Sequence, residues 1–87
     1  MRELLFMPNA WEDLGWWIKN DIKMVKKIYS LLENTCKTPF EGIGQPERLK
    51  TNYSGYWSRR INLAHRIVYK VEDSQIVVHS LRGHYQD

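Results

Sequence analysis

Apolar and polar side chains alternate in three runs along the second half of the chain. Each run is rich in β-branched or aromatic residues, and short connections separate one run from the next. Such alternation is typical of antiparallel strands joined by hairpins. We predict a β-meander over Tyr56 to Ile61, Arg66 to Val71 and Gln75 to Leu81, with Arg48 to Lys50 as an additional short strand.

The first half of the chain favours a different architecture. Glu3 to Phe6 indicates a short strand, and the residues after it place apolar side chains at helical spacing. Pro8 suits the first turn of a helix, and Asn9 with Glu12 resembles a capping box, so a helix should begin there. The apolar positions of this helix are Trp11, Leu14, Trp17 and Ile18.

A second helix should follow Lys19-Asn20-Asp21, which interrupt the first helix and offer capping side chains. Its apolar stripe comprises Ile22, Val25, Ile28, Tyr29 and Leu32. Lysines gather on the other side, at positions 19, 23, 26 and 27. This basic stripe is either a solvated face or a contact surface for nucleic-acid phosphates.

The segment from Thr35 to Pro46 has no periodicity, and its prolines and glycines predict a surface loop. Gly42-Ile43-Gly44 neither follows a strand nor opens a helix, which excludes a dinucleotide-binding fingerprint. The whole pattern predicts a single α+β domain over residues 1–87: a short N-terminal strand, two helices and an antiparallel β-meander.

Composition and charge narrow the function only slightly. The net charge of +3 and the pI near 9.1 favour polyanionic partners. No apolar run approaches the roughly 20 residues that span a bilayer, so we expect neither membrane insertion nor secretion. A single cysteine, Cys36, excludes an internal disulfide, and the histidines lack zinc-ligand spacing, with His65 and His79 interpreted as structural. We therefore expect a cytoplasmic protein without metal or cofactor.

Strand register decides which side chains meet. A tight first hairpin pairs Arg60 with Arg66, and paired residues share one face of a sheet. A second hairpin turning about Asp73-Ser74, with Arg66 facing Arg82, brings His84 to that same face. Adjacent guanidiniums repel each other unless an anion lies between them, and a phosphate suits the planar fork of arginine. A phosphate-bearing substrate is the simplest occupant.

RNA can be cut without a metal when a base, a cation and an acid converge on one phosphodiester. Glu47, Arg66 and His84 are candidates for these three roles, and Tyr85 follows as an orienting or stacking residue. Each residue also has a plainer interpretation. Glu47 is then a solvated loop acid, Arg66 part of an exposed ion pair, His84 an exposed terminal histidine and Tyr85 a packing residue.

Motifs that follow one another from Thr38 to Tyr85 carry a family resemblance, and the likeness itself runs from the N-terminal strand to Tyr85. They are Thr38-Pro39-Phe40-Glu41-Gly42, Gly44-Gln45-Pro46-Glu47-Arg48-Leu49-Lys50, Ser54-Gly55-Tyr56-Trp57-Ser58-Arg59-Arg60-Ile61, His65-Arg66-Ile67-Val68-Tyr69 and His84-Tyr85. With these motifs the chain resembles the Txe/YoeB toxins of the RelE superfamily.

The resemblance implies a ribosome-dependent mRNA endoribonuclease from a bacterial type II toxin-antitoxin pair. It also implies a microbial-RNase-like α+β fold and a tendency to form homodimers. By position, Glu47 looks like the general base, Arg66 the phosphate and transition-state stabiliser, and His84 the general acid. Tyr85 looks like an orienting or stacking residue.

The resemblance extends to substrate contacts and partners. Lys50 and Arg60 match basic residues that line the family's substrate cleft. Family members are similarly neutralised by an antitoxin of the Phd/YefM type, YefM- or Axe-like, whose partly disordered C-terminal segment folds onto the toxin. The implied partners are therefore that antitoxin, the ribosome with its mRNA, and a second copy of the chain.

One departure concerns the end of the chain, where Gln86 and Asp87 follow the tyrosine at which family chains often finish. Asp87 adds a carboxylate close to a site meant for phosphate. Two other functions stay open on the residues alone. One is a ParE-type toxin that inhibits gyrase by binding, and the other is a non-catalytic basic RNA-binding module.

Overall fold

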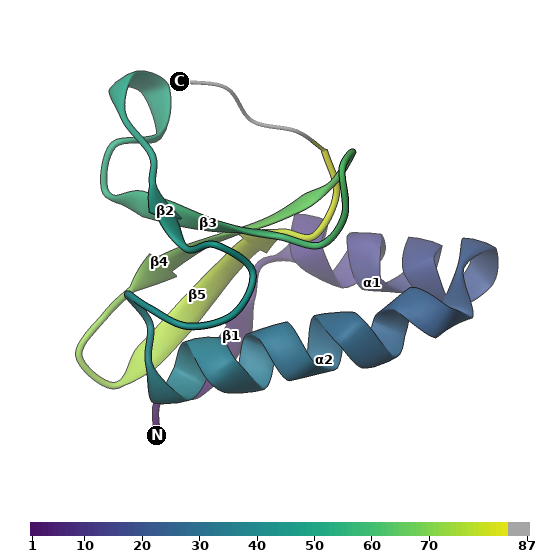
Figure 1. The fold of residues 1–87 in the computed structure, drawn as a ribbon, viewed down its shortest axis with the longest axis horizontal. Coiled ribbons are helices and arrows are strands. Elements are labelled where there is room, and N and C mark those ends of the chain that lie inside the picture. The colour runs from purple at the N-terminus through teal and green to yellow at the C-terminus, as the bar shows by residue number, and fades with distance from the viewer. Residues whose placement is uncertain (84–87) are drawn as a thin grey trace.

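The computed structural model describes residues 1–83, over which two helices lie against one face of a five-stranded sheet (Figure 1). In chain order the elements are β1 (Glu3–Phe6), α1 (Pro8–Asn20), α2 (Ile22–Lys37), β2 (Glu47–Arg48), a 3₁₀ turn (Thr51–Tyr53), β3 (Tyr56–Arg60), β4 (Arg66–Val71) and β5 (Gln75–Ser80). The α+β class and this element order confirm the sequence prediction. His84 and Tyr85 lie outside the described residues.

The strands lie side by side in the order β1-β5-β4-β3-β2. β3, β4 and β5 form the predicted antiparallel meander, and β2 pairs antiparallel with β3. β1 instead pairs parallel with β5, which makes the sheet mixed. Parallel neighbours need a long crossover connection. Here α1 and α2 are part of that connection, which carries the chain from β1 at one edge of the sheet to β2 at the opposite edge.

The core lies between the helices and the sheet. Every other residue of β3, β4 and β5 points toward the helices, including Ile67, Tyr69 and Val78, which are fully buried. The opposite face, called here the open face, carries the alternate residues. The buried positions of α2 are Ile28, Leu31, Leu32, Thr35 and Cys36.

That buried set corrects the predicted stripe of α2. Ile22 and Tyr29 were expected to face the core, yet they are 59% and 66% exposed. The spacing of the buried residues is helical to the end of α2, so the helix continues through Cys36 to Lys37. The predicted start of the surface loop at Thr35 was therefore wrong, because Thr35 and Cys36 are helical and buried.

The predicted positions of Pro8 and Asp21 are confirmed, but the predicted capping bonds do not form within residues 1–83. α1 begins at Pro8 with Met7 at the N-cap, so Asn9 lies inside the helix and the capping box does not form. The Met7 N–H donates to the Val78 carbonyl at 3.0 Å, which continues the pairing of β1 with β5 and sets where α1 can begin. Asp21 is the N-cap of α2, but within residues 1–83 its side chain makes no capping bond.

A β-bulge in β5 changes the register between β4 and β5 near the end of the described chain. From the turn at Asp73-Ser74, simple pairing of β4 with β5 would place Arg66 opposite Leu81. The register shifts by one residue at His79, as bulges do. The register pairs end with Val68 and Ser80, and beyond them the Arg66 N–H donates to the Gly83 carbonyl at 2.9 Å. This bond places Gly83, not Arg82, opposite Arg66, so the register assumed from the sequence was one residue off.

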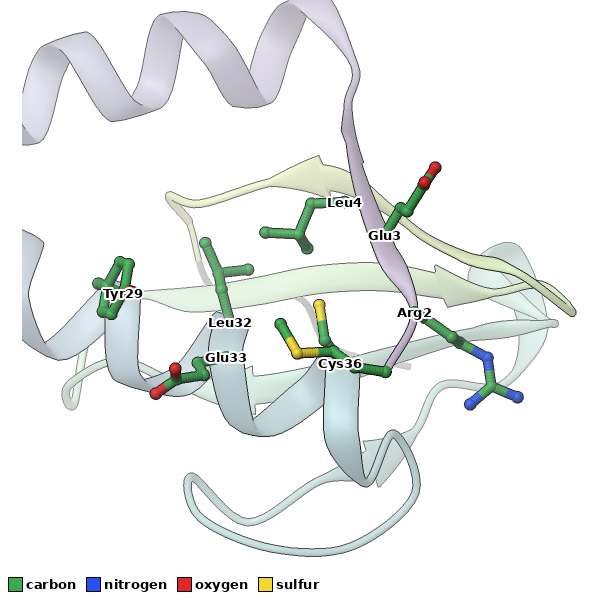
Figure 2. A pocket seen from close by; sticks show the side chains of 8 residues that line it. Arg2, Glu3, Leu4, Tyr29, Leu32, Glu33 and Cys36 are labelled. Atoms are coloured by element: carbon green, nitrogen blue, oxygen red, sulfur yellow. The ribbon is translucent and has the colours of Figure 1, made fainter.

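An apolar groove lies at the β1 edge of the sheet, far from β2 in the strand order. It has a volume of about 520 Å³ and lies between β1 and α2. Figure 2 shows Leu32 and Cys36 of α2 pointing toward Leu4 of β1. Burial raises the pKa of the Cys36 thiol above its ordinary value, so the thiol stays protonated. In residues 1–83 no helix is both long and apolar enough to span a membrane.

Candidate active site

Glu47, Ser58 and Arg66 meet on the open face. Pairing of β2 with β3 places Glu47 opposite Ser58, and Arg66 lies at the start of the neighbouring β4. Arg66 Nη1 donates to Ser58 Oγ at 3.0 Å and to Glu47 Oε2 at 3.3 Å. The structure therefore brings together the proposed base and the proposed phosphate-binding cation, which lie 19 residues apart in the chain.

The two charged partners differ in exposure. The Arg66 side chain is 11% exposed, whereas the Glu47 side chain is 64% exposed. Arg66 Nε is buried and has no hydrogen-bond partner among residues 1–83. A guanidinium held in place beside a solvent-exposed carboxylate suits the binding of an anion.

Ser58 is a member of the site that the sequence analysis missed. It is fully buried and aligns Arg66 by accepting a hydrogen bond from Nη1. Alternation along β3 does place Ser58 on the same face as Arg60, so the signal was present. It was hidden because only the pairing of β2 with β3 shows that Glu47 lies opposite Ser58.

The two predicted substrate-binding residues occupy separate positions around this cluster. Arg60 pairs with Arg66 across β3 and β4, as predicted. It also lines a groove of about 270 Å³ with Lys27 of the basic stripe and Gln45 of the loop. Lys50 is exposed just after β2.

The chain that leads to His84 and Tyr85 is tied down beside Arg66. The Leu81 N–H donates to buried Asp13 Oδ2 at 2.9 Å, and Trp17 Nε1 donates to the Leu81 carbonyl at 2.8 Å. The Arg66 N–H donates to the Gly83 carbonyl at 2.9 Å. The described chain therefore ends at the backbone of Arg66, immediately before His84 in the sequence.

Arg59 holds the loop that leads to Glu47. It is fully buried, and all of its N–H groups donate to neutral acceptors. The acceptors are the Tyr69 hydroxyl (3.1 Å), Asn34 Oδ1 (2.5 Å) and the carbonyls of Thr38 (2.6 Å), Glu41 (3.0 Å) and Ile43 (3.0 Å). Three of these carbonyls belong to the loop, so one side chain fixes its course.

Two neighbours complete this arrangement. The Tyr69 hydroxyl donates to the Pro39 carbonyl at 2.7 Å, and burial raises its pKa although Arg59 opposes the shift. Gly44 adopts φ +83°, and a Cβ there would lie 2.6 Å from Leu31 Cδ2. Glycine is thus required where the loop passes between α2 and β3.

The histidines expected to be structural have specific neighbours. The His79 ring lies at the bulge, and its centroid is 6.2 Å from that of the Tyr53 ring and 5.6 Å from that of the Tyr56 ring. The His65 ring packs edge-on against Trp17 at 5.1 Å, and its Nδ1 accepts a hydrogen bond from the Gly83 N–H at 3.0 Å. Within residues 1–83 no three His, Cys, Asp or Glu side chains cluster in a way that could hold a metal ion.

Comparison with known proteins identifies the class and then the family. The fold matches that of YafQ from Escherichia coli with a TM-score of 0.72 at 18% identity, over 95% of this chain and 93% of that one. This match defines a RelE/YafQ-like fold. A family model described as "YoeB-like toxin of bacterial type II toxin-antitoxin system" matches residues 6–85. The chain therefore belongs to the YoeB-like toxins, which confirms the resemblance drawn from the motifs.

Individual relatives agree with this assignment. A protein named Toxin YoeB from Synechocystis is 46% identical over 84 residues, covering 97% of this chain and 98% of the relative. A YoeB dimer from Staphylococcus aureus matches with a TM-score of 0.89 at 48% identity, over 97% of this chain and 98% of that one. A YoeB-YefM complex from the same organism matches with a TM-score of 0.87 at 48% identity, over 98% of this chain and 99% of that one.

Proposed function

We propose that this toxin is a ribosome-dependent mRNA endoribonuclease that inhibits translation. One observation carries the proposal: the Arg66 guanidinium contacts Glu47 and Ser58 on the open face, and its backbone binds Gly83, the residue before His84. Base, cation and acid are thereby assigned to one small area of the surface. Membership of the YoeB-like toxins supports the same conclusion.

The proposed reaction is cleavage through the 2′-hydroxyl of the RNA itself. Glu47 takes the proton of that hydroxyl, and the oxygen attacks the adjacent phosphorus. Arg66 stabilises the negative charge of the phosphorane by charge-assisted hydrogen bonds. His84 then donates a proton to the departing 5′ oxygen as the P–O bond breaks, which leaves a 2′,3′-cyclic phosphate and a 5′-hydroxyl.

Other residues are proposed to hold the substrate. Lys50 and Arg60 contact phosphates that flank the scissile one, and the electrostatic attraction weakens with salt. Tyr85 orients or stacks on a base next to the cut. Dependence on the ribosome follows if the ribosome supplies the substrate geometry that a site of this size does not impose alone.

The same proposal extends to partners and location. We expect a cognate antitoxin of the YefM type to neutralise the toxin and two copies of the chain to form a homodimer. The YoeB-YefM complex and the YoeB dimer support both expectations. A target on translating ribosomes places the protein in the cytoplasm.

Mapping of transcript 5′ ends after a brief pulse of expression tests the proposal. New ends should appear within translated codons, and should vanish when translation is blocked. Glu47→Gln and His84→Ala should each reduce cutting by about 10²- to 10⁴-fold. Glu12→Gln is the matched control, because Glu12 is an exposed acid of α1 and should cut like the wild type.

Each other outcome points elsewhere. Uncut transcripts together with inhibited gyrase would indicate the ParE-type function. Bound but uncut RNA would indicate a non-catalytic RNA-binding module. If His84→Ala still cut mRNA at the wild-type rate, the assigned mechanism would be wrong.

A further inference from the structure

Both backbone polar groups of Gly83 are bound by two consecutive residues. The Gly83 N–H donates to His65 Nδ1 at 3.0 Å, and the Gly83 carbonyl accepts from the Arg66 N–H at 2.9 Å. Gly83 has φ +97°, a conformation that favours glycine, so the chain turns here. The direction in which the chain leaves toward His84 is set at this point.

The ladder between β4 and β5 no longer supports the chain here. The register pairs end with Val68 and Ser80, so the residues after Ser80 rely on individual contacts. Leu81 is held by Asp13 and Trp17 of α1. His65 makes the last side-chain contact before His84 among the described residues, and it acts on the peptide plane nearest to that residue.

His65 is itself firmly placed. Asn62 Oδ1 accepts hydrogen bonds from the N–H groups of Ala64 (2.9 Å) and His65 (2.8 Å). The His65 carbonyl accepts from the Ile61 N–H at 2.9 Å. Its ring lies against Trp17 and, at a centroid distance of 6.0 Å, against Trp16. Backbone and ring are both constrained, so Nδ1 has a defined direction.

The contact also specifies the form of the imidazole. Nδ1 can accept the Gly83 N–H only when it carries no proton, so the ring proton must lie on Nε2. If Nδ1 carried a proton, its N–H and the Gly83 N–H would both be donors, and no hydrogen bond could form between them. The bond is therefore selective for an acceptor at the place that Nδ1 occupies, and a side chain of similar bulk without an acceptor does not replace it.

We propose that His65 is a positioning residue for the RNA-cleaving site. By accepting the Gly83 N–H it holds the peptide that leads into His84 next to the backbone of Arg66, and His65 itself touches neither the substrate nor the reacting atoms. The inference rests on the proposed function, because it takes His84 to be the general acid. A displacement of about 1 Å in a catalytic group can cost about 10²-fold in rate.

A matched pair of variants isolates the acceptor from the packing. His65→Asn and His65→Leu both remove the ring that packs on Trp17, and only Asn retains an acceptor close to the place of Nδ1. Cleavage is measured on programmed ribosomes over a range of toxin concentrations. His65→Leu should lower the maximal rate by about 10- to 100-fold with half-saturation within about twofold of wild type. His65→Asn should retain the maximal rate within about threefold of wild type.

Three results would overturn the proposal. A maximal rate for His65→Asn as low as that for His65→Leu would show that ring packing, not the acceptor, matters. A wild-type rate for His65→Leu would show that the bond has no role in catalysis. A wild-type maximal rate with a higher toxin concentration at half-saturation would indicate a role in substrate binding instead.

Two further measurements keep the outcomes separate. Should His65→Leu fail to fold, nitrogen NMR of the wild type still decides: His65 Nδ1 should be unprotonated and coupled to the Gly83 N–H, and a protonated Nδ1 would refute the proposal. His84→Ala is measured in parallel. If it cuts at the wild-type rate, the proposed role of His84 fails whatever the His65 variants do.

Discussion

The two sides of the candidate site are supported in different ways. On the loop side, residues 38–48, the buried Arg59 donates to three loop carbonyls, and Tyr69, Asn34 and the pairing of β2 with β3 add further bonds. The terminal side, residues 81–83, is held by separate bonds from Asp13, Trp17, His65 and the backbone of Arg66. Most side-chain bonds to the loop carbonyls come from the single residue Arg59, whereas the bonds of the terminal side come from two segments of the chain.

The difference has a physical consequence. A buried guanidinium without a paired carboxylate is stable only while its acceptors stay in place, so cation and loop depend on each other. Each bond of the terminal side can be lost alone. We therefore expect the loop side to fail as a unit and the terminal side to weaken step by step.

Replacing Arg59 with Met should have the largest effect on stability. The free energy of unfolding should fall by about 3–5 kcal/mol, because several loop carbonyls lose their donor together. Equilibrium unfolding in urea measures the loss. Arg59→Lys is the control: it keeps the charge but not the fork and should lose an intermediate amount. A loss below about 1 kcal/mol for Arg59→Met would contradict the concentrated support.

Asp13→Ala should have the next largest effect and should act on the terminal side alone. The Leu81 N–H would be left buried without an acceptor, which costs about 2 kcal/mol. Hydrogen exchange should accelerate at Leu81 while the amides of residues 38–44 keep their protection. Asp13→Asn retains an acceptor and serves as the control. Faster exchange in the loop as well would show that the two sides are coupled.

Tyr69→Phe should cost about 1 kcal/mol at neutral pH, because the hydroxyl accepts from Arg59 and donates to Pro39. Burial raises the pKa of Tyr69 in the folded state. Its contribution is therefore complete below the unfolded pKa of about 10 and is lost as the pH rises through the higher folded pKa. Unfolding measured from neutral to alkaline pH should show that loss in the wild type and less of it in Tyr69→Phe. Equal alkaline losses would show that Tyr69 is not the group responsible.

Glu47→Gln should have the smallest effect on stability, below about 0.5 kcal/mol, since its ion pair with Arg66 is largely exposed on the Glu47 side. The same substitution is expected to abolish most RNA cutting. Thermal unfolding measured beside the cleavage assay separates the two properties. A large loss of stability would mean that Glu47 belongs to the support of the loop rather than to the chemistry.

Much of the architecture could be predicted from local patterns. Alternation predicted the meander, with the bounds of β4 unchanged and those of β3 and β5 within one residue. Helical spacing predicted both helices, but not the N-cap of α1 or the buried face of α2. Those details depend on tertiary contacts. Met7 is the N-cap of α1 because its N–H is bound to the Val78 carbonyl of β5, which holds Met7 in line with β1.

The sequence by itself determined the elements, the pairing of Arg60 with Arg66 and the residues whose chemistry suits RNA cleavage, because these depend on spacing along the chain. The tertiary structure alone decided that Arg66 contacts both Glu47 and Ser58, that Arg59 binds the loop, and that His65 faces Gly83. It also placed the bulge at His79 and the bond from the Arg66 N–H to the Gly83 carbonyl. These contacts join residues distant in the chain, and their geometry follows from how the strands register and the helices pack rather than from any local pattern.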